Sequence, residues 1–140
     1  MRHRARRQAD FTLIELMTVV MVIGILAAIA VLNFGDSVRR TSEKATMGDM
    51  ASIRKAIGIY GSDNTGALPP LLSDLTTGGK YLRKIPAAHP APHHAASAAV
   101  LAAAAANDTG GWVYDLTSDG NTVFVNCTHT DSKGSVWTAY

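Results

Sequence analysis

The stretch that decides the fold is FTLIELMTVVMVIGILAAIAVLNF, Phe11 to Phe34. It is apolar almost throughout and contains one carboxylate, Glu15, near its start. At 1.5 Å of rise per residue, a helix of this length would extend about 36 Å, which exceeds the hydrocarbon thickness of a typical bilayer. The stretch therefore predicts a membrane-spanning helix.

Glu15 is unusual in such a helix. A charged side chain at the centre of a bilayer costs roughly 2.5 to 3.5 kcal/mol on insertion scales, so a carboxylate in this position is a functional-site hypothesis and needs a partner. The alternative is that Glu15 lies in the headgroup region, where its side chain reaches water and has no special role.

Residues 1–10, MRHRARRQAD, form a short basic leader. It contains four of the thirteen basic residues, and the positive-inside tendency places it on the cytoplasmic side, so that the C-terminal part crosses the membrane. A nucleic-acid-binding arm is the alternative. It is less favoured because the remaining charges are mixed in sign and the net charge is only +2.

The rest of the chain is long enough for one small exported domain, residues 63–140. Cys127 is the only cysteine. We therefore expect that neither an intrachain disulfide nor a cysteine-based zinc site can form, and Cys127 itself is interpreted as a small buried residue of a strand.

Residues 35–62 are predicted to continue the helix with an amphipathic pattern. Met50, Ile53, Ile57 and Tyr60 share one helical face, which should pack against the domain. Glu43 is expected to be an ordinary surface charge.

Residues 66–86 read as a proline-bounded loop with a helical turn near residues 71–75, followed by an irregular segment, residues 87–94. The alanine-rich residues 95–107 are compatible with a short helix by propensity alone. Three histidines fall in this part of the chain and are interpreted as solvated rather than metal-binding: His89, His93 and His94.

The last thirty residues alternate with a two-residue period in residues 111–117, 122–128 and 135–140. Gly and Asx residues at 118–121 and 130–134 suit hairpin turns. The predicted fold class is α+β, with a long N-terminal helix packed on a small three-stranded antiparallel C-terminal sheet.

The basic leader, the FTLIEL segment, Gly24 and the ILAAIA run at residues 25–30 together resemble the N-terminus of type IV pilins and type II secretion pseudopilins. The resemblance implies that a prepilin peptidase cleaves between Asp10 and Phe11 and methylates the new amine. It also implies that Glu15 sets the register of assembly by pairing with a neighbour's N-terminus. The residues it places in the membrane and later in the filament core are Leu13, Ile14, Leu16, Val20, Ile23, Gly24, Leu26 and Ile29.

Two positions depart from the family pattern. Asp10 stands where the family nearly always has Gly, so an uncleaved bitopic membrane protein with a ligand-binding outer domain remains an alternative. Leu32 stands where many members have a Pro that kinks the helix, so the helix is expected to continue without a break.

The expected function is that of a structural subunit of a type IV pilus-like filament, and the major pseudopilin of a type II secretion system is the alternative. The resemblance implies a single-pass inner-membrane protein with a cytoplasmic N-terminus, which afterwards forms a homo-oligomeric periplasmic or cell-surface filament. Its implied partners are the prepilin peptidase, an inner-membrane platform protein and, indirectly, an assembly ATPase.

An enzyme is not expected, because the chain has no G-x-S-x-G, H-E-x-x-H or phosphate-binding glycine motif. No cofactor is expected either. Major pseudopilins often bind calcium near their C-terminal strands, but Asp115, Asp119 and Asp131 form no recognisable ligand run, and no metal is predicted.

Overall fold

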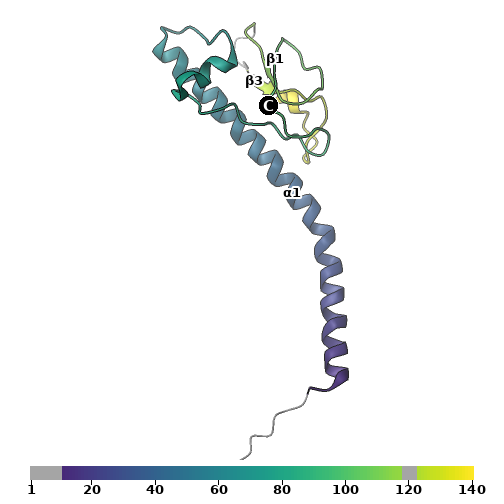
Figure 1. Ribbon diagram of the computed structural model, residues 1–140. Coiled ribbons are helices and arrows are strands. Elements are labelled where there is room, and N and C mark those ends of the chain that lie inside the picture. Colours follow the sequence, from purple (N-terminus) through teal and green to yellow (C-terminus); the bar gives the residue numbers. More distant parts are fainter. Residues whose placement is uncertain (1–10, 118–122) are drawn as a thin grey trace, which may run out of the picture. The chain divides into compact units, whose positions relative to one another are not determined.

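The computed structural model describes residues 11–117 and 123–140, and gives the backbone alone at 31–33 (Figure 1). The contacts divide the chain into two compact units between Ser37 and Val38. The residues up to Ser37 are called the N-terminal unit below, and Val38–Tyr140 the C-terminal unit.

Helix α1, Leu13–Asp63, is the only element described in the N-terminal unit. Its residues from Val38 onward belong to the C-terminal unit. Its backbone stays helical through position 32, as expected in the absence of a proline there. The helix ends where Thr65 and Gly66 take positive φ angles of 56° and 91°, and the Gly66 N–H donates to the carbonyl of Gly61 at 2.7 Å.

The core of the C-terminal unit is built on the predicted face of α1. Met50, Ile53 and Ile57 are buried, and Tyr60 packs against the core from its edge, so this prediction is confirmed. The predicted turn near residues 71–75 is also confirmed, as the 3₁₀ helix η1, Leu72–Gly79. Other buried members of this core are Ala56, Leu72, Leu75, Ala88, Trp112, Tyr114, Val123, Val125, Cys127 and Trp137.

The sheet has three short strands in the order β1-β2-β3: β1, Val100–Ala102; β2, Trp112–Tyr114; and β3, Val123–Val125. Strands β2 and β3 pair antiparallel, as predicted, with Val113 opposite Phe124. Strands β1 and β2 pair in parallel, so the sheet is mixed rather than wholly antiparallel. The predicted turn at 118–121 lies outside the described residues.

Strand β1 replaces the short helix that alanine propensity suggested for residues 95–107. Its pairing with β2 overrides a weak local preference, because helix propensities differ by less than about 1 kcal/mol per residue among non-proline residues. Gly111 permits this pairing. A Cβ there would lie 2.4 Å from the Ala99 carbonyl oxygen, which accepts the N–H of Trp112 at 2.8 Å.

The predicted third strand at residues 135–140 is wrong. One antiparallel bridge joins Thr130 to Val136, after which the chain turns into the 3₁₀ helix η2, Trp137–Ala139. The turn buries the Trp137 side chain completely and places its ring 5.8 Å from that of Tyr140. Burial of the largest side chain in this segment thus takes precedence over its alternating pattern.

The alternation of buried and exposed residues that the two-residue period predicts is also absent within β2 and β3. Val113 and Phe124 are buried together with their neighbours, so both faces of these two strands are covered. The two-residue period would place Leu116 on the same face as Trp112 and Tyr114, but Leu116 is 50% exposed and lies beyond the end of β2.

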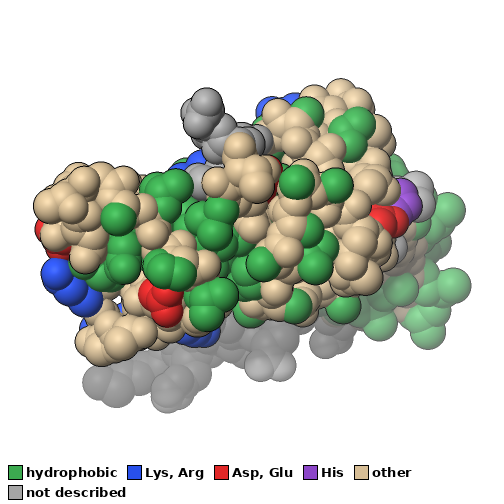
Figure 2. Space-filling view, turned by 90° about the horizontal axis from the view of Figure 1, so that it is seen from above, with side chains coloured by type: hydrophobic (Ala, Val, Ile, Leu, Met, Phe, Trp, Pro, Cys, Tyr) green, Lys and Arg blue, Asp and Glu red, His purple; other side chains and the backbone are tan. Residues whose placement is uncertain are grey.

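Polar side chains of α1 connect the helix to loops of the C-terminal unit. Glu43, expected at the surface, is only 2% exposed and accepts the Ser132 N–H at 3.0 Å and the Ser132 hydroxyl. Arg54 donates from Nη2 to the carbonyl oxygen of Val123 at 2.7 Å. On the face drawn in Figure 2, the exposed charged side chains lie scattered in small groups of either sign.

Candidate functional site: the apolar half of helix α1

The N-terminal unit exposes an apolar helix on all of its sides. In the most apolar window of α1 no side chain is buried, and this helix is long and apolar enough to cross a membrane. The seven larger side chains predicted for the membrane or filament core are between 56% and 76% exposed, and the space around Gly24 is open. A helix that is apolar all round requires a surrounding of lipid or of other helices.

Thr12 and Glu15 form the N-terminal cap of this helix. The Glu15 carboxylate accepts the Thr12 backbone N–H at 2.9 Å and the Thr12 hydroxyl at 2.8 Å, both at Oε2. In return, the Glu15 N–H donates to the Thr12 hydroxyl oxygen at 3.3 Å. This reciprocal arrangement is a capping box, which satisfies donors that an isolated helix start leaves unpaired.

The capping box also fixes where the charge of Glu15 lies. Its carboxylate is held within the first turn, beside the residue that would carry the new amine after cleavage, Phe11, whose side chain is 82% exposed. Within the described part of the chain, the contacts of this carboxylate all end on Oε2, which leaves Oε1 for a second partner. Asp10, on the other side of the predicted cleavage point, lies outside the described residues.

The carboxylates near the C-terminal strands are used by the fold. Asp131 accepts the N–H groups of Lys133 and Ser135 at Oδ1 and the hydroxyl of Tyr140 at Oδ2. Burial alone would raise the pKa of Asp131, but these hydrogen bonds outweigh it and the pKa is lowered. Asp115 accepts the N–H of Thr117 at 2.7 Å, and Asp119 lies outside the described residues.

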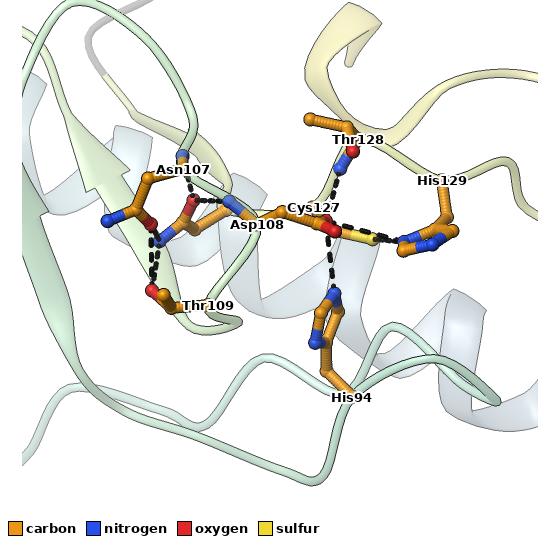
Figure 3. Close-up of polar contacts among 8 residues, drawn as sticks. His94, Asn107, Asp108, Thr109, Cys127, Thr128 and His129 are labelled. Carbon is orange, nitrogen blue, oxygen red and sulfur yellow. Dashed lines mark hydrogen bonds and ion pairs between the residues drawn. The ribbon is translucent and has the colours of Figure 1, made fainter.

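A second polar group, which the sequence did not predict, is drawn in Figure 3: His94, Asp108, Cys127 and His129 converge. The interpretation of His94 as solvated is wrong, because its side chain is 16% exposed and its Nε2 lies 3.1 Å from Asp108 Oδ1. The backbone N–H of Thr128 holds the pKa of Asp108 at about 2, against an opposing effect of burial. Cys127 is fully buried, as expected, although it follows the end of β3 rather than lying in a strand, and this burial raises its pKa.

Sequence spacing gave almost no signal for this second group. Only Cys127 and His129 are close in the sequence, two residues apart in one segment. His94 and Asp108 come from two other loops and reach the group through the tertiary fold.

Comparison with known protein families finds a match for the N-terminal segment. Residues 6–31 match the model of the prokaryotic N-terminal methylation motif. Through this segment the chain is similar to the type IV pilins and the type II secretion pseudopilins.

The curated relatives include proteins of both kinds. Type II secretion system core protein G of Aeromonas hydrophila is 34% identical over 59 residues, which are 42% of this chain and 41% of the relative. Core protein G of Escherichia coli K12 is 27% identical over 96 residues, 58% of this chain and 66% of the relative. Type IV major fimbrial protein FimA of Dichelobacter nodosus is 47% identical over 60 residues, 41% of this chain and 38% of the relative.

In these three pairs the chain spans between 38% and 66% of the relative's length. No solved structure matches the chain.

Proposed function

We propose that this protein is a structural subunit of a type IV pilus-like filament, processed by prepilin peptidase and assembled through its N-terminal helix. The observation that carries the proposal is an exposed apolar helix whose first turn is capped by the Glu15 carboxylate. This helix start lies inside the segment that matches the methylation motif. Before assembly, lipid covers the helix, and in the filament neighbouring copies of the same helix cover it.

Cleavage between Asp10 and Phe11 would create an ammonium group within one turn of Glu15. In a staggered array of helices, the carboxylate of one subunit can pair with the ammonium of the next. Pairing offsets much of the cost of burying either charge away from water. The capping box supports this role because it holds the carboxylate at the start of the helix before a neighbour arrives.

The leader would stay in the cytoplasm, and the C-terminal unit would lie on the far side of the inner membrane. Extraction of the helix from lipid requires that helix–helix packing in the filament replace its lipid contacts. A cytoplasmic ATPase that acts through a membrane platform protein would supply the work. The proposal of these two partners rests on the resemblance to the family.

The second candidate function is the major pseudopilin of a type II secretion system. It is favoured by the match to Escherichia coli core protein G, which covers 96 residues and so extends well past the methylation motif. Neighbouring genes separate the two candidates, because a secretin and other secretion genes indicate a pseudopilus and a retraction ATPase indicates a pilus.

The mass of the mature chain tests the proposal against an uncleaved bitopic protein. We expect a product that begins at methylated Phe11 in cells with prepilin peptidase and the intact chain in cells without it. Asp10→Gly restores the residue usual in the family and is the matched control. An intact Met1 start in the wild type, with cleavage of Asp10→Gly, would contradict processing of the natural chain and favour the bitopic alternative.

A further inference from the structure

We propose that His94, Asp108, Cys127 and His129 form a structural site for one divalent transition-metal ion, with Zn²⁺ as the preferred ion. This site lies within the C-terminal unit and is independent of the proposed function of the N-terminal helix.

The four ligand atoms lie close to the spacing that a tetrahedral zinc site requires. They are one nitrogen from each histidine, a carboxylate oxygen and the thiol sulfur, and they all lie within 4.8 Å of one another. Zinc–nitrogen and zinc–oxygen bonds of 2.0 to 2.1 Å imply tetrahedral edges of about 3.3 Å, and a zinc–sulfur bond of 2.3 Å lengthens the edge to about 3.6 Å.

Three of the edges are short enough for direct comparison. Asp108 Oδ1 lies 3.1 Å from His94 Nε2 and 3.3 Å from His129 Nδ1. Cys127 Sγ lies 3.6 Å from His129 Nδ1. These three edges match a tetrahedral site, and the remaining distances, none above 4.8 Å, would shorten on binding.

The surroundings hold these side chains in place. Asp108 has a positive φ of 62°, and its N–H donates to the side-chain oxygen of Asn126, which is 1% exposed. The N–H of Thr128 donates to Asp108 Oδ1 at 2.8 Å, and Figure 3 shows Thr128 and His94 on opposite sides of this carboxylate. Such outer contacts orient metal ligands and raise affinity.

The histidine rings are also held. His93 stacks on His129 with ring centroids 4.0 Å apart and planes 6° apart. A Cβ on Gly110 would lie 3.2 Å from the Cβ of His94, so this glycine lets the loop carrying Asp108 approach His94 closely.

The donor set indicates the class of ion and the role. Two imidazoles, one thiolate and one carboxylate suit Zn²⁺ better than Ca²⁺ or Mg²⁺, which prefer oxygen ligands. Binding would release the thiol proton, and the thiolate and carboxylate charges would then balance the ion. Four protein ligands complete a tetrahedron, which is the arrangement of structural rather than catalytic sites.

Such an ion would join three segments that carry little regular structure: the loop at His94, the loop at Asp108 and the segment after β3. The chain has one cysteine, so no intrachain disulfide can do this. Small domains commonly use a metal in that role.

The test uses the full chain in detergent, stripped of metal with a chelator and then titrated with Zn²⁺ alone. We expect one ion per chain with a dissociation constant below about 1 μM, and a melting temperature raised by about 10 °C or more at saturation. Titration with Co²⁺ should give the visible bands of tetrahedral coordination and a near-ultraviolet thiolate charge-transfer band.

Variants assign the ligands. His94→Gln and Cys127→Ser should each weaken Zn²⁺ binding by at least about 100-fold, because they remove a ligand rather than an outer contact. His89→Gln is the matched control, since His89 belongs to the same proline-rich segment and is not part of the group. Its affinity should equal that of the wild type.

Two results would overturn the proposal. One is Zn²⁺ binding that is absent, or equal in the wild type and His94→Gln. The other is a Co²⁺ complex of the wild type without the thiolate band. If Cys127→Ser fails to fold, His94→Gln still decides, because it alters a side chain at the edge of the core.

Discussion

The Glu15 carboxylate accepts two hydrogen bonds from Thr12, at 2.9 Å from the backbone N–H and 2.8 Å from the hydroxyl. Glu15 therefore has a local partner in the single chain, before any neighbour is present. Glu15 therefore contributes to the structure of the helix start and also contributes a charge. The substitution Glu15→Gln separates these two contributions, because glutamine can also close a capping box but carries no charge.

We predict that Glu15→Gln and Glu15→Ala both insert into the membrane at wild-type levels and both lower the yield of filaments by at least about tenfold. A lost neighbour ion pair explains this result, since removal of one partner of a buried pair costs roughly 3 to 5 kcal/mol. Membrane fractionation and the yield of sheared filaments are the measurements. Near-normal filaments from Glu15→Gln, with few from Glu15→Ala, would assign the effect to the cap instead.

Glu43 should be important for the stability of the C-terminal unit. Glu43→Ala removes the buried acceptor of the Ser132 N–H and hydroxyl and the ion-pair partner of Arg39, and should lower the free energy of unfolding by about 2 kcal/mol. Tryptophan fluorescence during denaturant unfolding reports on this unit alone, because both tryptophans, Trp112 and Trp137, are buried in it. Lys44→Ala changes the next, exposed residue and should stay within about 0.5 kcal/mol of the wild type.

Arg54 should contribute through the bonds it donates to the carbonyl of Val123, at 3.0 Å from Nε and 2.7 Å from Nη2. Arg54→Met keeps most of the aliphatic length and removes these donors, so we expect a loss of about 2 kcal/mol in the same fluorescence assay. Lys55→Met, at the neighbouring exposed position, is the control. Equal effects of the two substitutions would contradict a specific role for Arg54.

The acid dependence of stability should involve Asp131 and Tyr140. The folded state lowers the pKa of Asp131, so its contribution is complete above the ordinary carboxyl range and is lost as the pH falls through the lower, folded pKa. Tyr140→Phe removes the hydrogen bond to Oδ2. The variant should be less stable than the wild type at pH 7, and the difference should shrink below about pH 4 as Asp131 becomes protonated.

The measurement is the free energy of unfolding of the wild type and of Tyr140→Phe between pH 7 and pH 2. Tyr81→Phe is the control, because it removes a longer bond of 3.2 Å to the exposed carboxylate of Asp63 and should have little effect. A Tyr140→Phe deficit that stays constant over the whole pH range would rule out the role of Asp131.

The features that sequence predicted well are those encoded by neighbouring residues. The apolar run at residues 11–34 and the 3.6-residue period of Met50, Ile53 and Ile57 are local, and each survives in the structure. The strands around Trp112 and Val123 were also found, because each combines apolar residues with nearby turn residues.

The features that sequence missed depend on contacts between distant segments. Strand β1 exists because β2 provides its backbone partners, and Glu43 is buried because Ser132 reaches it. The His94 group is another case, since its four members come from three segments that share no spacing rule. The resemblance to the pilin family lies in the first helix, so it could not predict these contacts in the C-terminal unit.

The exposed apolar side chains of α1 have one more consequence for assembly. Because residues 19–30 carry no polar side chain, this part of two such helices can slide or rotate against each other with only small changes in contact energy. A displacement by one residue would still separate a carboxylate at position 15 from a neighbour's ammonium group. In the proposed filament, a single charge would therefore determine the geometry, and the apolar surface would supply most of the cohesion.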